Sequence, residues 1–152
     1  MTNTATTALA WILKVGLAAL LLWAGWAKLG EPGVFLEEIA NYQLWPELAP
    51  YLASPLPGLE IVLGLALLLP PRTTLARAAA LLTFGMMLVF TIAVTSVVLR
   101  GIDISCGCFG TGTGTVTWLT VLRDVAFSLA ALFALVFSLR AEAKGGVQLP
   151  TI

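Results

Sequence analysis

The two cysteines of this chain, Cys106 and Cys108, are separated by a single glycine in a short polar segment. The sequence contains no histidine, so any thiol or soft-metal chemistry must come from this pair. Three uses of the pair are open: a structural disulfide, a metal site, or a disulfide that exchanges electrons with other molecules.

The first two uses fit the spacing poorly. A disulfide stabilises a fold mainly by closing a loop, and bridging residues two positions apart closes almost none. Structural zinc takes four ligands, usually Cys and His, so no metal cofactor is expected. Two thiolates can nevertheless accept Cu(I), so a Cu(I)-binding or transport protein is the rival function from another class.

The third use fits the spacing best. Residues at i and i+2 can reach the roughly 4.4–6.8 Å between Cα atoms that a disulfide needs, and Gly107 permits the tight turn. Strain in such a small ring raises the reduction potential. We therefore favour a redox-active Cys106/Cys108 pair.

Charged residues within long apolar runs form a second group of candidates: Glu60, Arg123 and Asp124, with Lys28 at the border of another run. An ionisable group in a bilayer is costly and is functional by default. Glu60 is expected to pair with Lys28 or Arg123, either as a structural tie or as part of the chemistry. In the chemical role, Arg123 or Lys28 favours a thiolate and Glu60 or Asp124 moves protons.

Aromatic residues are expected near the same level as these charges. Trp26, Phe109 and Trp118, together with Lys28, could hold a flat quinone ring, which makes a quinone the candidate cofactor. The alternative is an ordinary interfacial belt of aromatic side chains, as many membrane proteins have.

The elements that must position these residues are transmembrane helices. The chain of 152 residues is 59% hydrophobic and 11% charged, whereas soluble domains are about a quarter charged. A zero net charge gives no indication of nucleic-acid binding. Since about 20 apolar residues cross a bilayer, we predict a single all-α membrane domain over 1–152. Its four spanning helices are predicted over residues 7–29, 56–70, 75–99 and 116–139.

Several local features refine this bundle. The second span is short, so it is expected to thin the bilayer or to begin among the headgroups. The first span resembles a signal peptide in part, but a retained helix is preferred because its apolar run extends upstream of Lys14. Thr73 or Thr74 can cap the third helix. A short amphipathic helix is expected in the first loop, with one apolar and one polar face. Its apolar face would hold Val34, Phe35, Ile39 and Tyr42, and its polar face Glu37, Glu38 and Asn41.

Positive residues indicate the orientation in the inner membrane. Arg72, Arg77, Arg140 and Lys144 gather on one side, so the positive-inside rule predicts cytoplasmic N- and C-termini. The loop with Cys106 and Cys108 then lies outside the cytoplasm, where disulfides form and persist.

The chain also resembles a known family. The runs at residues 23–29, 33–35, 39–46 and 56–60 resemble the DoxX-like membrane proteins. Asp103-Ile104-Ser105-Cys106-Gly107-Cys108-Phe109-Gly110, followed by Arg123-Asp124, is similar to the branch of methylamine utilisation proteins called MauE.

This resemblance implies a four-helix bundle similar to the core of vitamin K epoxide reductase-type enzymes. It further implies that Cys106 and Cys108 help to form disulfides in exported proteins, working with a thioredoxin-like partner or with client thiols. Those enzymes use two cysteine pairs, so here one pair serves both tasks or a partner supplies the second. A non-enzymatic membrane anchor for a thioredoxin-like protein is a further alternative.

Overall fold

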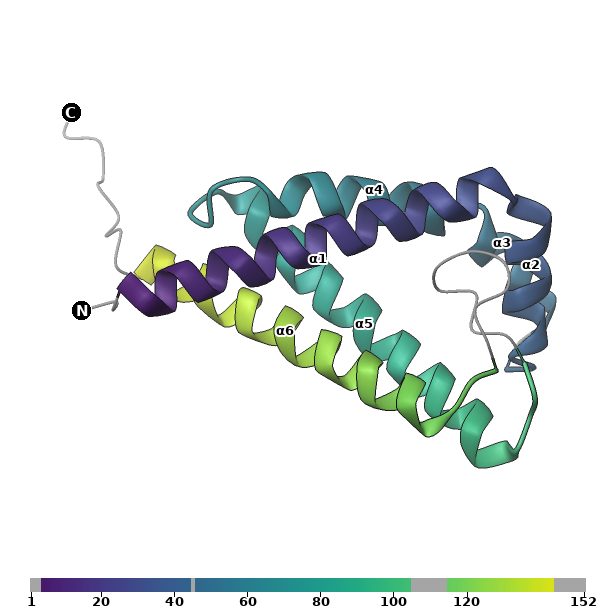
Figure 1. Ribbon diagram of the computed structural model, residues 1–152. Coiled ribbons are helices and arrows are strands. Elements are labelled where there is room, and N and C mark those ends of the chain that lie inside the picture. The colour runs from purple at the N-terminus through teal and green to yellow at the C-terminus, as the bar shows by residue number, and fades with distance from the viewer. Residues whose placement is uncertain (1–3, 45, 105–114, 144–152) are drawn as a thin grey trace.

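The computed structural model describes residues 4–44, 46–104 and 115–143 (Figure 1). The regular elements in these ranges are all helices: α1 (Thr4–Gly30), α2 (Pro32–Asn41), the 3-10 helix η1 (Pro46–Leu48), α3 (Ala49–Ala53), α4 (Leu56–Leu67), α5 (Thr74–Arg100) and α6 (Trp118–Ala143). In the described ranges, four segments are long and apolar enough to cross a membrane: Thr6–Gly30, Ala49–Leu67, Thr74–Arg100 and Trp118–Ala141. The predicted all-α, four-span architecture is confirmed.

The four long segments pack as two pairs. Helix α1 lies against α4, and α5 lies against α6, while α1–α6 and α4–α5 contacts join the pairs into one bundle. Figure 1 shows the start of α1 and the end of α6 at one end of this bundle, with α2 and α3 at the other. Many large apolar side chains of the four long segments are exposed on the outside of the bundle, which suits the hydrocarbon of a bilayer. Helices can cross that hydrocarbon because they satisfy their own backbone hydrogen bonds.

Helices α1 and α4 approach each other closely through two glycines. A Cβ atom at Gly25 would lie 2.8 Å from the Pro57 carbonyl oxygen, and one at Gly64 would lie 2.9 Å from Cγ of Leu22. Small residues at such positions let the backbones of membrane helices pack tightly. The pairing of α1 with α4 therefore depends on the missing side chains of Gly25 and Gly64.

The second span covers Ala49–Leu67, whereas residues 56–70 were predicted. Helix α4 begins at Leu56, as predicted, but ends at Leu67, and α3 adds the turns that precede it. Lys14 of α1 is fully buried, and its Nζ donates a 3.0 Å hydrogen bond to the Leu69 carbonyl oxygen. The last carbonyls of a helix lack intrahelical partners and attract cations. Lys14, considered above only in comparing a signal peptide with a retained helix, thus caps the turn after the short helix α4.

Helix α2 is the predicted short helix of the first loop, but its faces differ from the expected ones. Phe35 and Glu38 are both buried, whereas Val34 is exposed. The prediction that Glu38 lies on an exposed polar face was wrong, because α2 packs against α3, η1 and α1 and the Glu38 side chain is buried. At the start of α5, Thr73 is the cap: its Oγ1 accepts a 3.2 Å hydrogen bond from the Ala76 amide.

Candidate functional site

A buried ion pair joins α1 to α4. Lys28 Nζ and Glu60 Oε1 are 2.5 Å apart, and the two side chains are only 4% and 2% exposed. The ammonium group also lies 5.1 Å from the ring centre of Phe35 and 5.6 Å from that of Phe90, within the range of cation–π attraction. Of the two partners predicted for Glu60, the structure brings it to Lys28.

A second ion pair lies on α6. Arg123 Nε donates to Asp124 Oδ1 at 2.9 Å, and its Nη2 lies 2.9 Å from the same oxygen. The Asp124 side chain is 9% exposed, whereas that of Arg123 is 32% exposed. The carboxylate is therefore held inside the bundle while part of the guanidinium reaches its surface.

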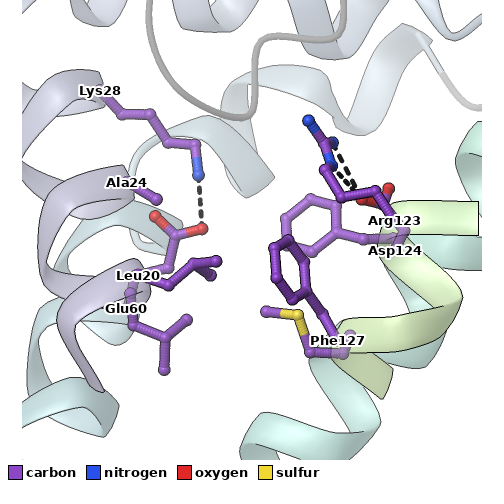
Figure 2. A pocket seen from close by; sticks show the side chains of 10 residues that line it. Leu20, Ala24, Lys28, Glu60, Arg123, Asp124 and Phe127 are labelled. Atoms are coloured by element: carbon purple, nitrogen blue, oxygen red, sulfur yellow. Dashed lines mark hydrogen bonds and ion pairs between the residues drawn. The ribbon is translucent and has the colours of Figure 1, made fainter. Parts of the chain in front are cut away.

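The two ion pairs face each other across a pocket. Figure 2 shows Lys28 and Glu60 on one wall and Arg123 and Asp124 on the opposite wall. The space open to the centre of a water molecule is about 40 Å³. Apolar side chains complete the lining: Leu20, Leu21, Ala24, Met87, Phe90 and Phe127. The pocket thus combines two charge-neutral pairs with an apolar and aromatic surround.

Each carboxylate keeps one oxygen without a hydrogen bond. Among the described residues, Glu60 Oε2 and Asp124 Oδ2 are buried and have no partner. Buried polar atoms are nearly always satisfied in folded proteins, and exceptions call for an explanation. Both carboxylates belong to side chains that line one pocket, and each has one oxygen that its ion pair leaves without a hydrogen bond.

The segment that carries the cysteines is held at both ends. The Val116 amide donates a 2.9 Å hydrogen bond to the Ile104 carbonyl oxygen. The residues just before and just after the cysteine segment therefore lie side by side. Just before it, Arg100 donates to the carbonyl oxygens of Tyr42, at 2.5 Å, and Gln43, at 3.3 Å. These bonds fasten the end of α5 to the end of α2. Sequence reasoning did not find this role of Arg100.

The remaining predicted site residues are less central to the pocket. Cys106, Cys108 and Phe109 lie outside the described residues. Trp26 and Trp118 are 77% and 58% exposed and are not among the residues that line the pocket.

The aromatic rings that line the pocket belong to Phe90 and Phe127, which sequence reasoning missed. The position of Phe127, one helical turn after Arg123, was a usable signal, because residues four apart share a helix face. Among the described residues, no three side chains of the metal-ligating types gather into a possible metal site.

Comparison with known proteins identifies the family. The model of the family "Methylamine utilisation protein MauE" matches residues 6–137. The methylamine utilization protein MauE of Paracoccus denitrificans is 36% identical over 125 residues, which cover 80% of this chain. The match covers 66% of that relative, so the chain spans just under two thirds of the relative's length. No solved structure matches the chain. With nearly its whole length matched by the family model, this chain belongs to the MauE family.

Proposed function

We propose that this protein is a membrane thiol–disulfide oxidoreductase whose Cys106/Cys108 pair exchanges electrons with extracytoplasmic proteins. One observation carries the proposal: the Val116–Ile104 hydrogen bond fixes the ends of the cysteine segment at one end of the bundle. The helices that flank this segment also contribute Phe90, Arg123 and Asp124 to the charged pocket. Redox cysteines are typically found near positive groups that favour the thiolate.

The proposed exchange proceeds in two steps. A thiolate of a reduced partner attacks one sulfur of the Cys106–Cys108 disulfide and forms a mixed disulfide. The partner's second thiolate attacks its own sulfur in that bond, which releases the partner as a disulfide and leaves Cys106 and Cys108 as thiols. The partner loses two electrons and two protons, and the cysteine pair gains them.

A membrane quinone is the proposed acceptor of these electrons. Oxidation of the two thiols restores the disulfide, and the quinone takes up the two electrons and two protons to become a hydroquinone. The reduction potentials of the partner and the acceptor set the direction, so the same groups can run the exchange in reverse.

The charged residues receive distinct roles in this proposal. The partly exposed guanidinium of Arg123 is better suited than Lys28 to favour a thiolate, because Lys28 is buried against Glu60. Glu60 and Asp124 are the candidates for moving the two protons, since each carboxylate lines the pocket and has one buried oxygen without a hydrogen bond.

The relative's name supplies a setting. It associates that protein with methylamine utilisation, and we propose that this chain serves the same process by forming disulfides in exported proteins. A thioredoxin-like protein is the proposed partner, and the inner membrane, with the cysteine segment outside the cytoplasm, is the proposed location.

Single cysteine variants test the function. Cys106→Ser and Cys108→Ser should each abolish catalytic oxidation of a reduced thioredoxin-like protein. The wild-type protein, with its disulfide formed, should accumulate a mixed disulfide, visible on a non-reducing gel, with a partner variant that keeps only its attacking cysteine. Thr115→Ala, just beyond the cysteine segment, should leave the rate unchanged. A wild-type rate in either cysteine variant would contradict the mechanism. Stoichiometric Cu(I) on a protein that oxidises no thiols would instead favour metal transport.

A further inference from the structure

We propose that helix α2 is a strap beside the charged pocket and that Arg100 is the clasp that holds this strap closed. With the clasp closed, α2 covers the pocket on the side of Lys28. With the clasp open, the end of α2 moves away and small neutral molecules reach the pocket from that side. The inference goes beyond the proposed function, because it concerns access to the pocket and requires no thiol chemistry.

The strap connects two helices that belong to different pairs. Within the described residues, α1 and α5 do not pack against each other. Figure 1 shows their ribbons diverging towards the end of the bundle that carries α2, and α2 running from the end of α1 towards the end of α5. The pocket lies between the two pairs, because its lining comes from α1, α4, α5 and α6. Helix α2 therefore spans the end of the bundle at which the pairs separate.

A buried contact anchors α2 beside the pocket. The side chain of Phe35 is 5% exposed, and its ring centre lies 5.1 Å from Lys28 Nζ. The same ammonium group lies 5.6 Å from the ring centre of Phe90, and both Lys28 and Phe90 line the pocket. Attraction between the cation and the Phe35 ring holds α2 against the pocket wall.

The other end of α2 is held by an exposed contact. Arg100, the last residue of α5, donates to the carbonyl oxygens of Tyr42 and Gln43, which directly follow α2. In the part of the chain that the structure describes, α2 packs against α3, η1 and α1 but not against α5. The long Arg100 side chain thus ties α2 to a helix with which it has no backbone packing.

This difference between the two contacts makes α2 a device that can open at one end. The hydrogen bonds of Arg100 are exposed, so water competes for both the guanidinium and the carbonyl oxygens. The contact between Phe35 and Lys28 is buried and is supported by the Lys28–Glu60 ion pair. Exposed contacts open locally at a much lower free energy than the packed core does. The clasp therefore opens while the anchor stays in place.

The test measures how often the pocket becomes accessible. The full-length protein with Cys106→Ser and Cys108→Ser, here called cysteine-free, receives a single reporter, Ala24→Cys. Ala24 lines the pocket and is 5% exposed. The detergent-solubilised protein is treated with N-ethylmaleimide, and mass spectrometry follows the labelling. When opening and closing are fast, a buried thiol reacts at a rate proportional to the fraction of open molecules.

Removing the clasp should make this labelling faster. Arg100→Met deletes both hydrogen bonds of a charged donor, so we expect the labelling rate at Ala24→Cys to rise at least tenfold. Arg77→Met is the matched control, because it makes the same substitution near the opposite end of α5, where Arg77 bonds within its own helical turn. The control should leave the rate unchanged.

A second reporter separates opening of the strap from loosening of the whole bundle. Ala131 of α6 is 1% exposed and belongs to the hydrophobic core, so labelling of Ala131→Cys should not respond to Arg100→Met. An equal rise at both reporters, or no rise at Ala24→Cys, would overturn the proposal. Since every protein in this test lacks Cys106 and Cys108, either failure would leave the proposed thiol–disulfide activity standing.

Discussion

At the scale of single residues, the Lys28–Glu60 pair is the most constrained feature of the site. Both side chains are almost completely buried, and a buried charge without its partner is strongly unfavourable. Removing one of the two charges should therefore destabilise the protein more than removing both. Comparing single and double variants measures the structural contribution of the pair separately from any role in chemistry.

Lys28→Met should destabilise the protein by about 3–5 kcal/mol, because Glu60 is left buried without a cation. The double variant Lys28→Met/Glu60→Gln should recover most of this loss, since it removes both charges. Unfolding in mixed detergent micelles, followed by circular dichroism, measures each free energy. Leu29→Met, at the exposed neighbouring position, is the matched control. Equal destabilisation of the single and double variants would show that the charge of Glu60 is not the cause.

If Glu60 moves protons, its role goes beyond this pairing. Glu60→Gln should then lower the rate of thiol-dependent quinone reduction at least tenfold in protein that is folded and monodisperse. Steady-state quinone absorbance at saturating partner gives that rate. Unchanged turnover in folded protein would leave Glu60 with the structural role alone.

At the scale of elements, the contact between α1 and α4 sets the position of one wall of the pocket. Gly25 on α1 faces the Pro57 carbonyl oxygen, one turn before Glu60. Helix α1 can hold Lys28 close to Glu60 only if the two backbones stay in this close approach.

Gly25→Ala should destabilise the bundle by about 1–3 kcal/mol, because the added methyl group overpacks a tight contact. Gly85→Ala on α5, where nothing lies within 4 Å of the added atom, should be neutral or slightly stabilising, since alanine favours a helix. The two unfolding free energies in the same detergent make the comparison. Similar values for the two variants would contradict the close α1–α4 contact.

The turn after α4 depends on α1 in a different way. Lys14→Met should lower the free energy of unfolding by about 1–3 kcal/mol, because the Leu69 carbonyl oxygen loses the charged donor that Lys14 supplies. Amide hydrogen exchange should rise locally in residues 67–73 more than in α6. Ile12→Met, on the exposed side of α1, provides the control, and unchanged exchange in the Lys14 variant would argue against this cap.

At the scale of the whole molecule, hydrophobic run length was enough to predict the helical bundle and its number of spans. The sequence also predicted that Glu60 pairs with Lys28 or Arg123, because few other charged residues lie in or beside the apolar segments. Sequence could not show that Lys14 caps α4 or that Glu38 is buried, since both depend on where α1 and α2 pack. The exposed positions of Trp26 and Trp118 likewise follow from helix rotation, which an apolar run does not define.

The orientation of the bundle is a prediction about the whole chain. In intact cells treated with a reductant, a membrane-impermeant maleimide should label Cys106 and Cys108, because the positive residues predict that their segment faces outward. Val116→Cys in the cysteine-free protein should be labelled from the same side. A cysteine introduced at Arg72 should react only after the membrane is permeabilised, and the reverse pattern would invert the proposed topology.

The hydrogen bond between the Val116 amide and the Ile104 carbonyl oxygen gives the connection between α5 and α6 a modular character. Because its two stems meet, residues can be added or removed between them without changing the spacing of the two helices. A change in the length of this connection would then alter its reach while the bundle beneath keeps its dimensions.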